Sequence, residues 1–199
     1  MSTARRRQIL AWTTTERLGL ADLLAELKDY EWRTATLCDG WDVRDLAAHL
    51  TLSTRLTLRL ALPAAIRARG NFDRMNDVLS RERAARYAPA ELVAQLRETA
   101  ASPRRAPGTS VLDPLVDMLV HGQDLARPLG RVRAMPIVPA VAALEYVLAH
   151  GAHRQVKGQR LVATDLDWAA GEGPTVTRAP LADLLLLATG RPVDVADQP

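Results

Sequence analysis

The chain has 199 residues, 48% hydrophobic and 25% charged, a balance typical of one compact globular domain or of a domain with a small appendage. Its formal net charge is +3, but apart from Arg5–Arg7 and Arg104–Arg105 the basic residues are scattered among acidic ones, so we expect no nucleic-acid partner. The single cysteine, Cys38, excludes an intrachain disulfide and favours a reducing compartment. Without a signal peptide or a membrane-spanning apolar run, the sequence predicts a cytoplasmic protein with no membrane partner.

The N-terminal part of the chain predicts two long helices. Apolar residues at helical spacing indicate a first helix over about residues 4–29. Asp42 can cap a second helix, which we expect to continue past Leu60, to kink at Pro63 and to end at Gly70. The polar, charge-rich stretch 71–88 is predicted to be a loop with a short helix.

Three further helices are expected in the next part. Pro89 precedes a third helix over about residues 90–101, and the proline- and glycine-containing stretch 102–109 predicts a loop. Asp113 and Pro114 suit the start of a fourth helix, Leu115–Gly130. A fifth helix is predicted over about residues 138–153.

The tail of the chain changes from helical periodicity to alternation. Residues 161–168 and 175–178 are predicted to form a hairpin around a turn at 171–174, before a last helix, Leu181–Ala188. An isolated hairpin is marginally stable in water, so we expect it to pack on the helices or on another chain.

Two polar side chains share one face of the predicted fourth helix. Asp117 and His121 are four residues apart, and Asp124 lies three residues further along the same stripe. Leucines flank them, so a carboxylate and an imidazole would meet at the edge of the core, where they need a partner. A divalent metal would satisfy both, although such a pair is by itself a weak signal. Asp117 could instead be a first-turn carboxylate that the helix dipole favours.

His49 is the candidate partner from elsewhere in the chain. It lies on one helical stripe with Leu46 and Leu50, so its side chain is expected to point inward. Two interpretations stay open: a metal ligand, or a core histidine bonded to a backbone carbonyl.

Two segments resemble a known family. Thr36–Leu50 reads T-L-C-D-G-W-D-V-R-D-L-A-A-H-L and is similar to the signature of the mycothiol-dependent maleylpyruvate isomerase-like proteins, within the wider DinB/YfiT-like superfamily. Val120–Ala126 reads V-H-G-Q-D-L-A and resembles that family's second signature. The resemblance implies a mainly α fold: a DinB-like up-down four-helix bundle over residues 1–156, with a small C-terminal α+β appendage, the hairpin and helix, over 157–199.

The resemblance also implies a metal site. Carried over by position, its three ligands are His49, Asp117 and His121; the isomerases carry Glu where this chain has Asp117. Two nitrogens and one carboxylate suit zinc first, and nickel, manganese or iron are compatible. Asp124 would accept a hydrogen bond from a ligand imidazole, or pair with Arg127.

The function that the resemblance implies is a metal-dependent, thiol-using isomerase or transferase that acts on a small molecule. Mycothiol would supply the thiol, whose pKa the metal lowers. The alternative is a non-catalytic metal- or ligand-binding module. No catalytic residue is assigned beyond the ligands, since Cys38 has no general base nearby in sequence and is expected to be a packed side chain. The protein is expected to be a monomer or a homodimer.

Overall fold

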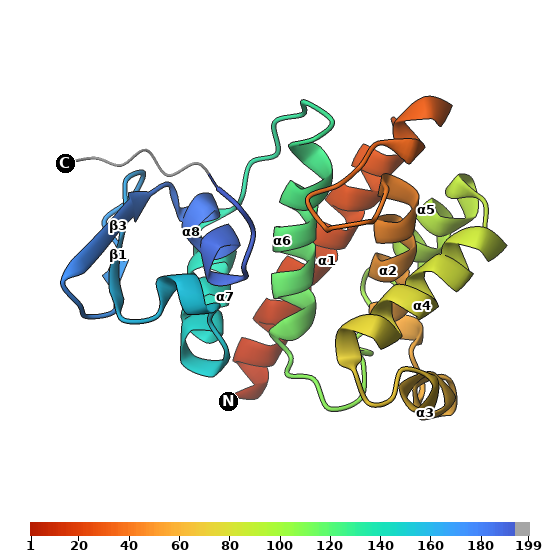
Figure 1. Ribbon diagram of the computed structural model, residues 1–199, viewed down its shortest axis with the longest axis horizontal. Coiled ribbons are helices and arrows are strands. Elements are labelled where there is room, and N and C mark those ends of the chain that lie inside the picture. Colours follow the sequence, from red (N-terminus) through yellow and green to blue (C-terminus); the bar gives the residue numbers. More distant parts are fainter. Residues whose placement is uncertain (194–199) are drawn as a thin grey trace. The chain divides into compact units, whose positions relative to one another are not determined.

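The computed structural model describes residues 1–193, which form eight α-helices, two 3-10 helices and three strands (Figure 1). The chain divides into two compact units, Met1–Arg133 and a second that begins at Ala134. The elements of the first unit are α1 (Thr3–Ala25), η1 (Asp29–Arg33), α2 (Val43–Arg55), α3 (Leu58–Arg67), α4 (Phe72–Arg86), α5 (Pro89–Glu98) and α6 (Asp113–Ala126). Those of the second are α7 (Ile137–His150), η2 (Arg154–Val156), β1 (Gln159–Ala163), β2 (Ala169–Ala170), β3 (Thr175–Ala179) and α8 (Leu181–Ala188).

Four helices of the first unit form a bundle. Helices α1 and α2 each pack against both α5 and α6, as Figure 1 shows. Burial of their apolar stripes drives this packing. The fully buried side chains at its centre include Leu20, Leu24, Leu46, Leu50, Leu92, Leu96, Met118 and Leu125. The predicted fold, a mainly α bundle with a small α+β appendage, is confirmed.

The predicted second helix is in fact two helices. Helix α2 ends at Arg55, because Leu56 and Thr57 adopt extended backbone angles, and α3 then begins at Leu58. Hydroxyls in the last turns of α2 compete for backbone carbonyls, since Thr51 donates to Ala48 and Ser53 donates to Leu50. Such bonds weaken a helix, and we attribute the early end to them.

The stretch predicted to be a loop with a short helix is instead the 15-residue helix α4. The side chain of Asn71 caps it by accepting a hydrogen bond from the Arg74 amide at 2.8 Å. Only Met75, Ser80 and Ala84 are buried, and they are small or polar apart from the methionine. Because so few apolar side chains of this helix are buried, the spacing of apolar residues in the sequence does not reveal it.

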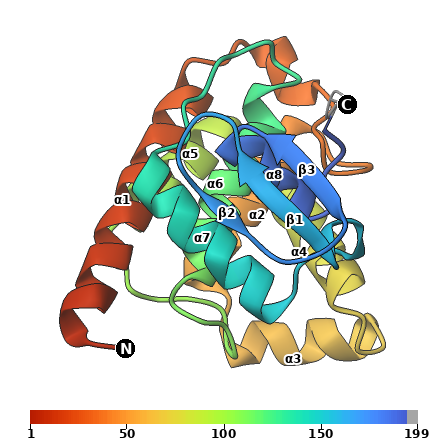
Figure 2. The ribbon, with the colours of Figure 1, turned by 90° about the vertical axis from the view of Figure 1, so that its left-hand side faces the viewer.

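The second unit contains a three-stranded sheet in the order β2-β1-β3 (Figure 2). Strand β1 pairs antiparallel with β2, where Val162 faces Ala169, and parallel with β3, where Gln159 faces Thr175. The prediction of a hairpin between residues 161–168 and 175–178 is therefore wrong, because the second of these strands runs parallel to the first. The chain passes very close to the start of β1 on its way to β3. Glycine allows this approach, since a Cβ at Gly173 would overlap the carbonyl oxygen of Gly158.

Helices α7 and α8 pack on each other, and α8 also contacts β1 and β3. Helix α7 therefore belongs to the compact unit that begins at Ala134, whereas the sequence predicts a boundary after residue 156. Within residues 1–193, none of the helices combines the length and the apolar character needed to cross a membrane.

A buried ion pair anchors the end of the first unit. Arg133 Nη2 donates to Glu16 Oε2 at 2.6 Å, with the two side chains only 15% and 8% exposed. The Gln123 side chain donates to the Arg133 carbonyl at 2.8 Å. Gly122 leaves room for the guanidinium, since a Cβ there would lie 2.8 Å from Arg133 Nε.

Removing one partner of this pair should destabilise the protein. We expect Arg133→Ala to lower the free energy of unfolding by about 3 kcal/mol, because it leaves the Glu16 carboxylate buried and unpaired. Urea unfolding measures the loss. The double variant Glu16→Gln/Arg133→Met should recover much of it; equal losses in both variants would contradict this account.

Candidate functional site

The loop between η1 and α2 has a regular internal structure. Ala35 and Asp42 form an antiparallel bridge, and the Thr36 hydroxyl accepts a hydrogen bond from the Cys38 amide at 3.2 Å. Asp42 then caps α2 by accepting from the Asp45 amide at 2.9 Å. These bonds present Cys38 on a fixed backbone at the start of α2.

Helix α4 holds this loop from outside. Arg81 Nη2 donates to the Gly40 carbonyl at 2.7 Å, and Arg81 Nε donates to Asp77 Oδ1 at 2.8 Å. Trp41 Nε1 donates to the same Asp77 oxygen at 2.7 Å. The pKa of Asp77 is lowered, chiefly by the Trp41 hydrogen bond, which outweighs the effect of burial. The sequence pattern does not predict this role of α4, because it does not predict the helix itself.

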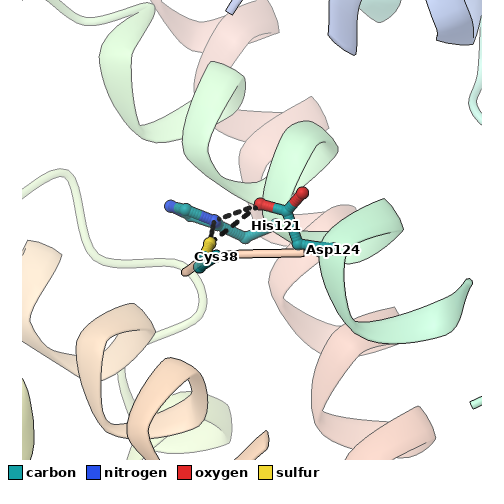
Figure 3. A group of neighbouring side chains, drawn as sticks. All are labelled: Cys38, His121 and Asp124. Carbon is teal, nitrogen blue, oxygen red and sulfur yellow. Dashed lines mark hydrogen bonds and ion pairs between the residues drawn. The ribbon is translucent and has the colours of Figure 1, made fainter. Parts of the chain in front are cut away.

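Three side chains meet where the loop contacts α6. Figure 3 shows Cys38, His121 and Asp124, whose ligand atoms all lie within 4.8 Å of one another. Asp124 Oδ2 accepts from His121 Nδ1 at 2.8 Å and from Cys38 Sγ at 3.3 Å, and Sγ lies 3.7 Å from Nδ1. Asp124 is fully buried. The other ring nitrogen of His121, Nε2, points away from both neighbours (Figure 3).

The protonation of His121 is set by its neighbours. Burial by itself would lower the pKa of the imidazole, but the hydrogen bonds with Asp124 and Cys38 outweigh burial and raise that pKa to about 9. The contacts with Asp124 and Cys38 therefore favour the protonated form of the His121 imidazole.

His49 lies on α2, opposite α6. Its ring centroid is 5.1 Å from that of His121, in an edge-to-face arrangement, and 5.1 Å from the Trp41 ring. His49 Nδ1 is 3.4 Å from the Ser80 hydroxyl of α4. The structure thus brings together two of the three residues that the sequence singled out as ligands.

Asp117 lies one turn before His121 on α6 and is half-buried. Its charge acts on Arg17, a buried residue of α1. Burial lowers the pKa of Arg17, and the Asp117 carboxylate partly offsets that effect. Asp117 is not a member of the cluster of Cys38, His121 and Asp124.

Ligand geometry distinguishes two ways in which this region could hold a metal. Tetrahedral zinc at about 2.0–2.2 Å from nitrogen and oxygen separates those atoms by roughly 3.3 Å. The 2.8 Å between His121 Nδ1 and Asp124 Oδ2 is a hydrogen-bond distance, so the cluster is a hydrogen-bonded network in this conformation. Nε2 of His121, on the far side of the ring, is the atom suited to a metal, because ligand histidines usually donate through the other nitrogen to a carboxylate.

Sequence spacing could find Asp124 but not Cys38. Asp124 lies one turn from His121, whereas Cys38 reaches the cluster only through the tertiary fold, across 86 residues of sequence from Asp124. Cys38 was expected to be only a packed side chain; it is half-buried and contacts both polar groups. The hydrogen-bonding partner of His49, Ser80, was missed because α4 was missed.

Facing helices of this bundle present two histidines, and a buried carboxylate holds one of them. The protein is therefore of the class of helical bundles that carry a polar site between their helices. Residues 14–113, just over half of the chain, match the family described as mycothiol maleylpyruvate isomerase N-terminal domain. The chain belongs to this family.

Solved structures agree on the fold. The crystal structure of the mycothiol-dependent maleylpyruvate isomerase has a TM-score of 0.63 and 16% sequence identity, over 98% of this chain and 92% of that one. A histidine-to-alanine mutant of that enzyme gives a TM-score of 0.62 at 15% identity, with the same coverage of both chains. A comparison with curated protein sequences finds no significant match.

The His121–Asp124 pair predicts a pH-dependent stability. Because the pKa of folded His121, about 9, lies above the unperturbed value of 6.5, its protonation stabilises the fold fully below about pH 6.5. That stabilisation, on the order of 3 kcal/mol, should be lost as the pH rises through about 9.

Thermal unfolding with chelator between pH 6 and pH 10 measures this loss. Asp124→Asn removes the charge with little change of shape and should flatten the profile over this range. An unchanged profile in Asp124→Asn would contradict the assignment of the stabilisation to this pair.

Proposed function

We propose that the protein is a divalent-metal-dependent enzyme that uses a small thiol, such as mycothiol, to isomerise or transfer a small electrophilic substrate. The proposed metal ligands are His49, Asp117 and His121, with Asp124 as the residue that positions His121. Zinc is the first choice of metal, and nickel, manganese or iron are compatible with the same ligands. Family membership supports the proposal, and the geometry of the two histidines carries it.

The Nδ1 atoms of both histidines contact neighbouring side chains. His121 Nδ1 donates to Asp124, and His49 Nδ1 contacts the Ser80 hydroxyl. We propose Nε2 of each ring as the ligand atom, and a centroid separation of 5.1 Å with rings nearly perpendicular suits two imidazoles that share one ion. A carboxylate that accepts from a ligand histidine fixes its orientation and raises its basicity.

Asp117 adds the carboxylate to this set. It projects from the same face of α6 as His121, because the two residues are four apart in a helix. It is half-buried, and its charge acts on the neighbouring Arg17. The ionised form of a carboxylate is the form that binds metal. Aspartate is one methylene shorter than the glutamate of the isomerases, so its reach from α6 is shorter.

When bound, a divalent metal lowers the pKa of a coordinated thiol and so supplies a thiolate at neutral pH. The residues of the chain contribute orientation and protection. Asp124 keeps a proton on Nδ1 of His121, and the loop that carries Cys38 and Trp41 covers this side of the two histidines. Since Cys38 already donates to Asp124, we assign it to the support of that carboxylate rather than to attack on the substrate.

Metal binding should stabilise the protein through all three ligands together. A ligand that binds only the folded state stabilises it by about 2.7 kcal/mol at a hundredfold excess over its dissociation constant. His49→Ala and His121→Ala should each abolish most of this gain, and their effects should not add, because either one removes the same ion. Asp117→Glu should be milder than Asp117→Ala.

The measurement is thermal unfolding of each variant with chelator and with added zinc, nickel or manganese. Cys38→Ser is the matched control: it should keep the metal-dependent gain if the ion binds through His49, Asp117 and His121. A wild-type melting temperature that is indifferent to chelator and to every metal, together with additive losses in the two histidine variants, would refute the site.

Activity separates the enzyme from the alternative, a non-catalytic metal- or ligand-binding module. The similar crystal structure is that of a mycothiol-dependent maleylpyruvate isomerase, so mycothiol with maleylpyruvate is the first assay. We expect turnover that requires both thiol and metal and that falls at least a hundredfold in His121→Ala, as expected for loss of a metal ligand. Metal-dependent stability without turnover of maleylpyruvate or other electrophiles would favour the binding module.

A further inference from the structure

A pocket lies in the first unit, between the N-terminal half of α1 and the segment that leads into α6. Its volume is about 320 Å³, within the range of about 300–1,000 Å³ typical of small-molecule sites. Apolar side chains form part of its wall: Ile9 and Leu10 from α1, with Val111 and Pro114 from the other side. None of the residues proposed as metal ligands lines it.

The rest of the wall is strongly basic. Five arginines line the pocket, Arg6, Arg7, Arg17, Arg104 and Arg105, and its lining contains no aspartate or glutamate. The fold thus unites the two basic clusters of the sequence. No ion pair to Arg6, Arg7, Arg104 or Arg105 occurs within residues 1–193.

The nearest acid in sequence has another role. Asp113 lies between the lining residues Val111 and Pro114, and its carboxylate accepts a hydrogen bond from the Ser110 amide. It is absent from the lining of the pocket.

Arg17 forms the inner end of the basic wall. It is only 1% exposed, and Nη1 donates to the carbonyls of Ala100 at 3.1 Å and Ser102 at 3.0 Å, so the guanidinium is fixed in place. Its Nε is buried and has no hydrogen-bond partner. Leaving a buried donor of a charged group unsatisfied is costly. The charge of Asp117 only partly offsets the effect of burial on this guanidinium.

We propose that this pocket binds a small organic anion, a carboxylate or phosphate group on an aromatic or aliphatic body. The arginines match the charge and the fork-like geometry of such groups. The apolar wall favours an organic body over a bare inorganic ion. The proposal requires neither a bound metal nor the activity proposed above; its one link to the proposed ligands is the charge of Asp117, which acts on Arg17.

Isothermal titration of the full chain with benzoate and with phenyl phosphate, in the presence of chelator and at low ionic strength, tests the proposal. We expect saturable binding of at least one of them, and at least tenfold weaker binding of benzamide, the uncharged analogue, and of inorganic phosphate. Arg104→Ala/Arg105→Ala should weaken binding at least tenfold, the loss expected from removing charge-assisted hydrogen bonds. Val111→Trp, which fills the pocket without changing its charge, should do the same.

The matched control is Arg59→Ala/Arg67→Ala, which removes two exposed arginines from α3 and should leave binding unchanged. Circular dichroism and melting temperatures verify that each variant is folded. The proposal is overturned if neither anion binds saturably, if benzamide or inorganic phosphate binds as well as the organic anions, or if the control pair loses as much affinity as the pocket variants. Because chelator is present throughout, this outcome does not depend on the metal site.

Discussion

The buried carboxylate of Asp124 is the constraint on which the site depends. A fully buried charge is tolerated only when hydrogen bonds or an opposite charge satisfy it, and here the His121 imidazole and the Cys38 thiol supply them. The backbone of the same residue takes part as well, since the Asp124 carbonyl accepts from the Leu37 amide at 3.2 Å. One residue of α6 thus fixes both the ring of His121 and the path of the loop that precedes α2.

This arrangement explains why a small domain carries so many polar groups at its centre. The loop, α4 and α6 meet around His49 of α2, and each contributes a hydrogen bond or a ring contact. Trp41 packs against His49 while its indole donates to Asp77, and Arg81 closes the network at Gly40. The histidines are therefore held on several sides before any ion or substrate is considered, as a preorganised site requires.

The sequence predicts the features that depend on residues close together in the chain, and it does not predict those that depend on residues far apart in the chain. The bundle helices α1, α5 and α6, the last helix α8 and the inward direction of His49 all follow from apolar periodicity, which is local. The contact between His121 and Asp124 follows from helical spacing. Cys38, Ser80 and Arg17 reach their partners only through tertiary packing, so no spacing reports them. Helix α4 was not predicted because its buried stripe is narrow and most of its other residues are charged. The hairpin was predicted wrongly because the path of the chain between the strands, which sets the direction of β3, cannot be read from apolar alternation.

Four consecutive residues of α6 divide their tasks in a way that joins two parts of the first unit. His121 and Asp124 face the site, while Gly122 accommodates the Arg133 side chain and Gln123 holds the Arg133 carbonyl. The chain therefore leaves the first unit attached to the same helical turn that bears the histidine. The last residue of the first unit and the orientation of the imidazole are thus fixed by contacts of a single turn, so a substitution that shifts that turn would alter both at once.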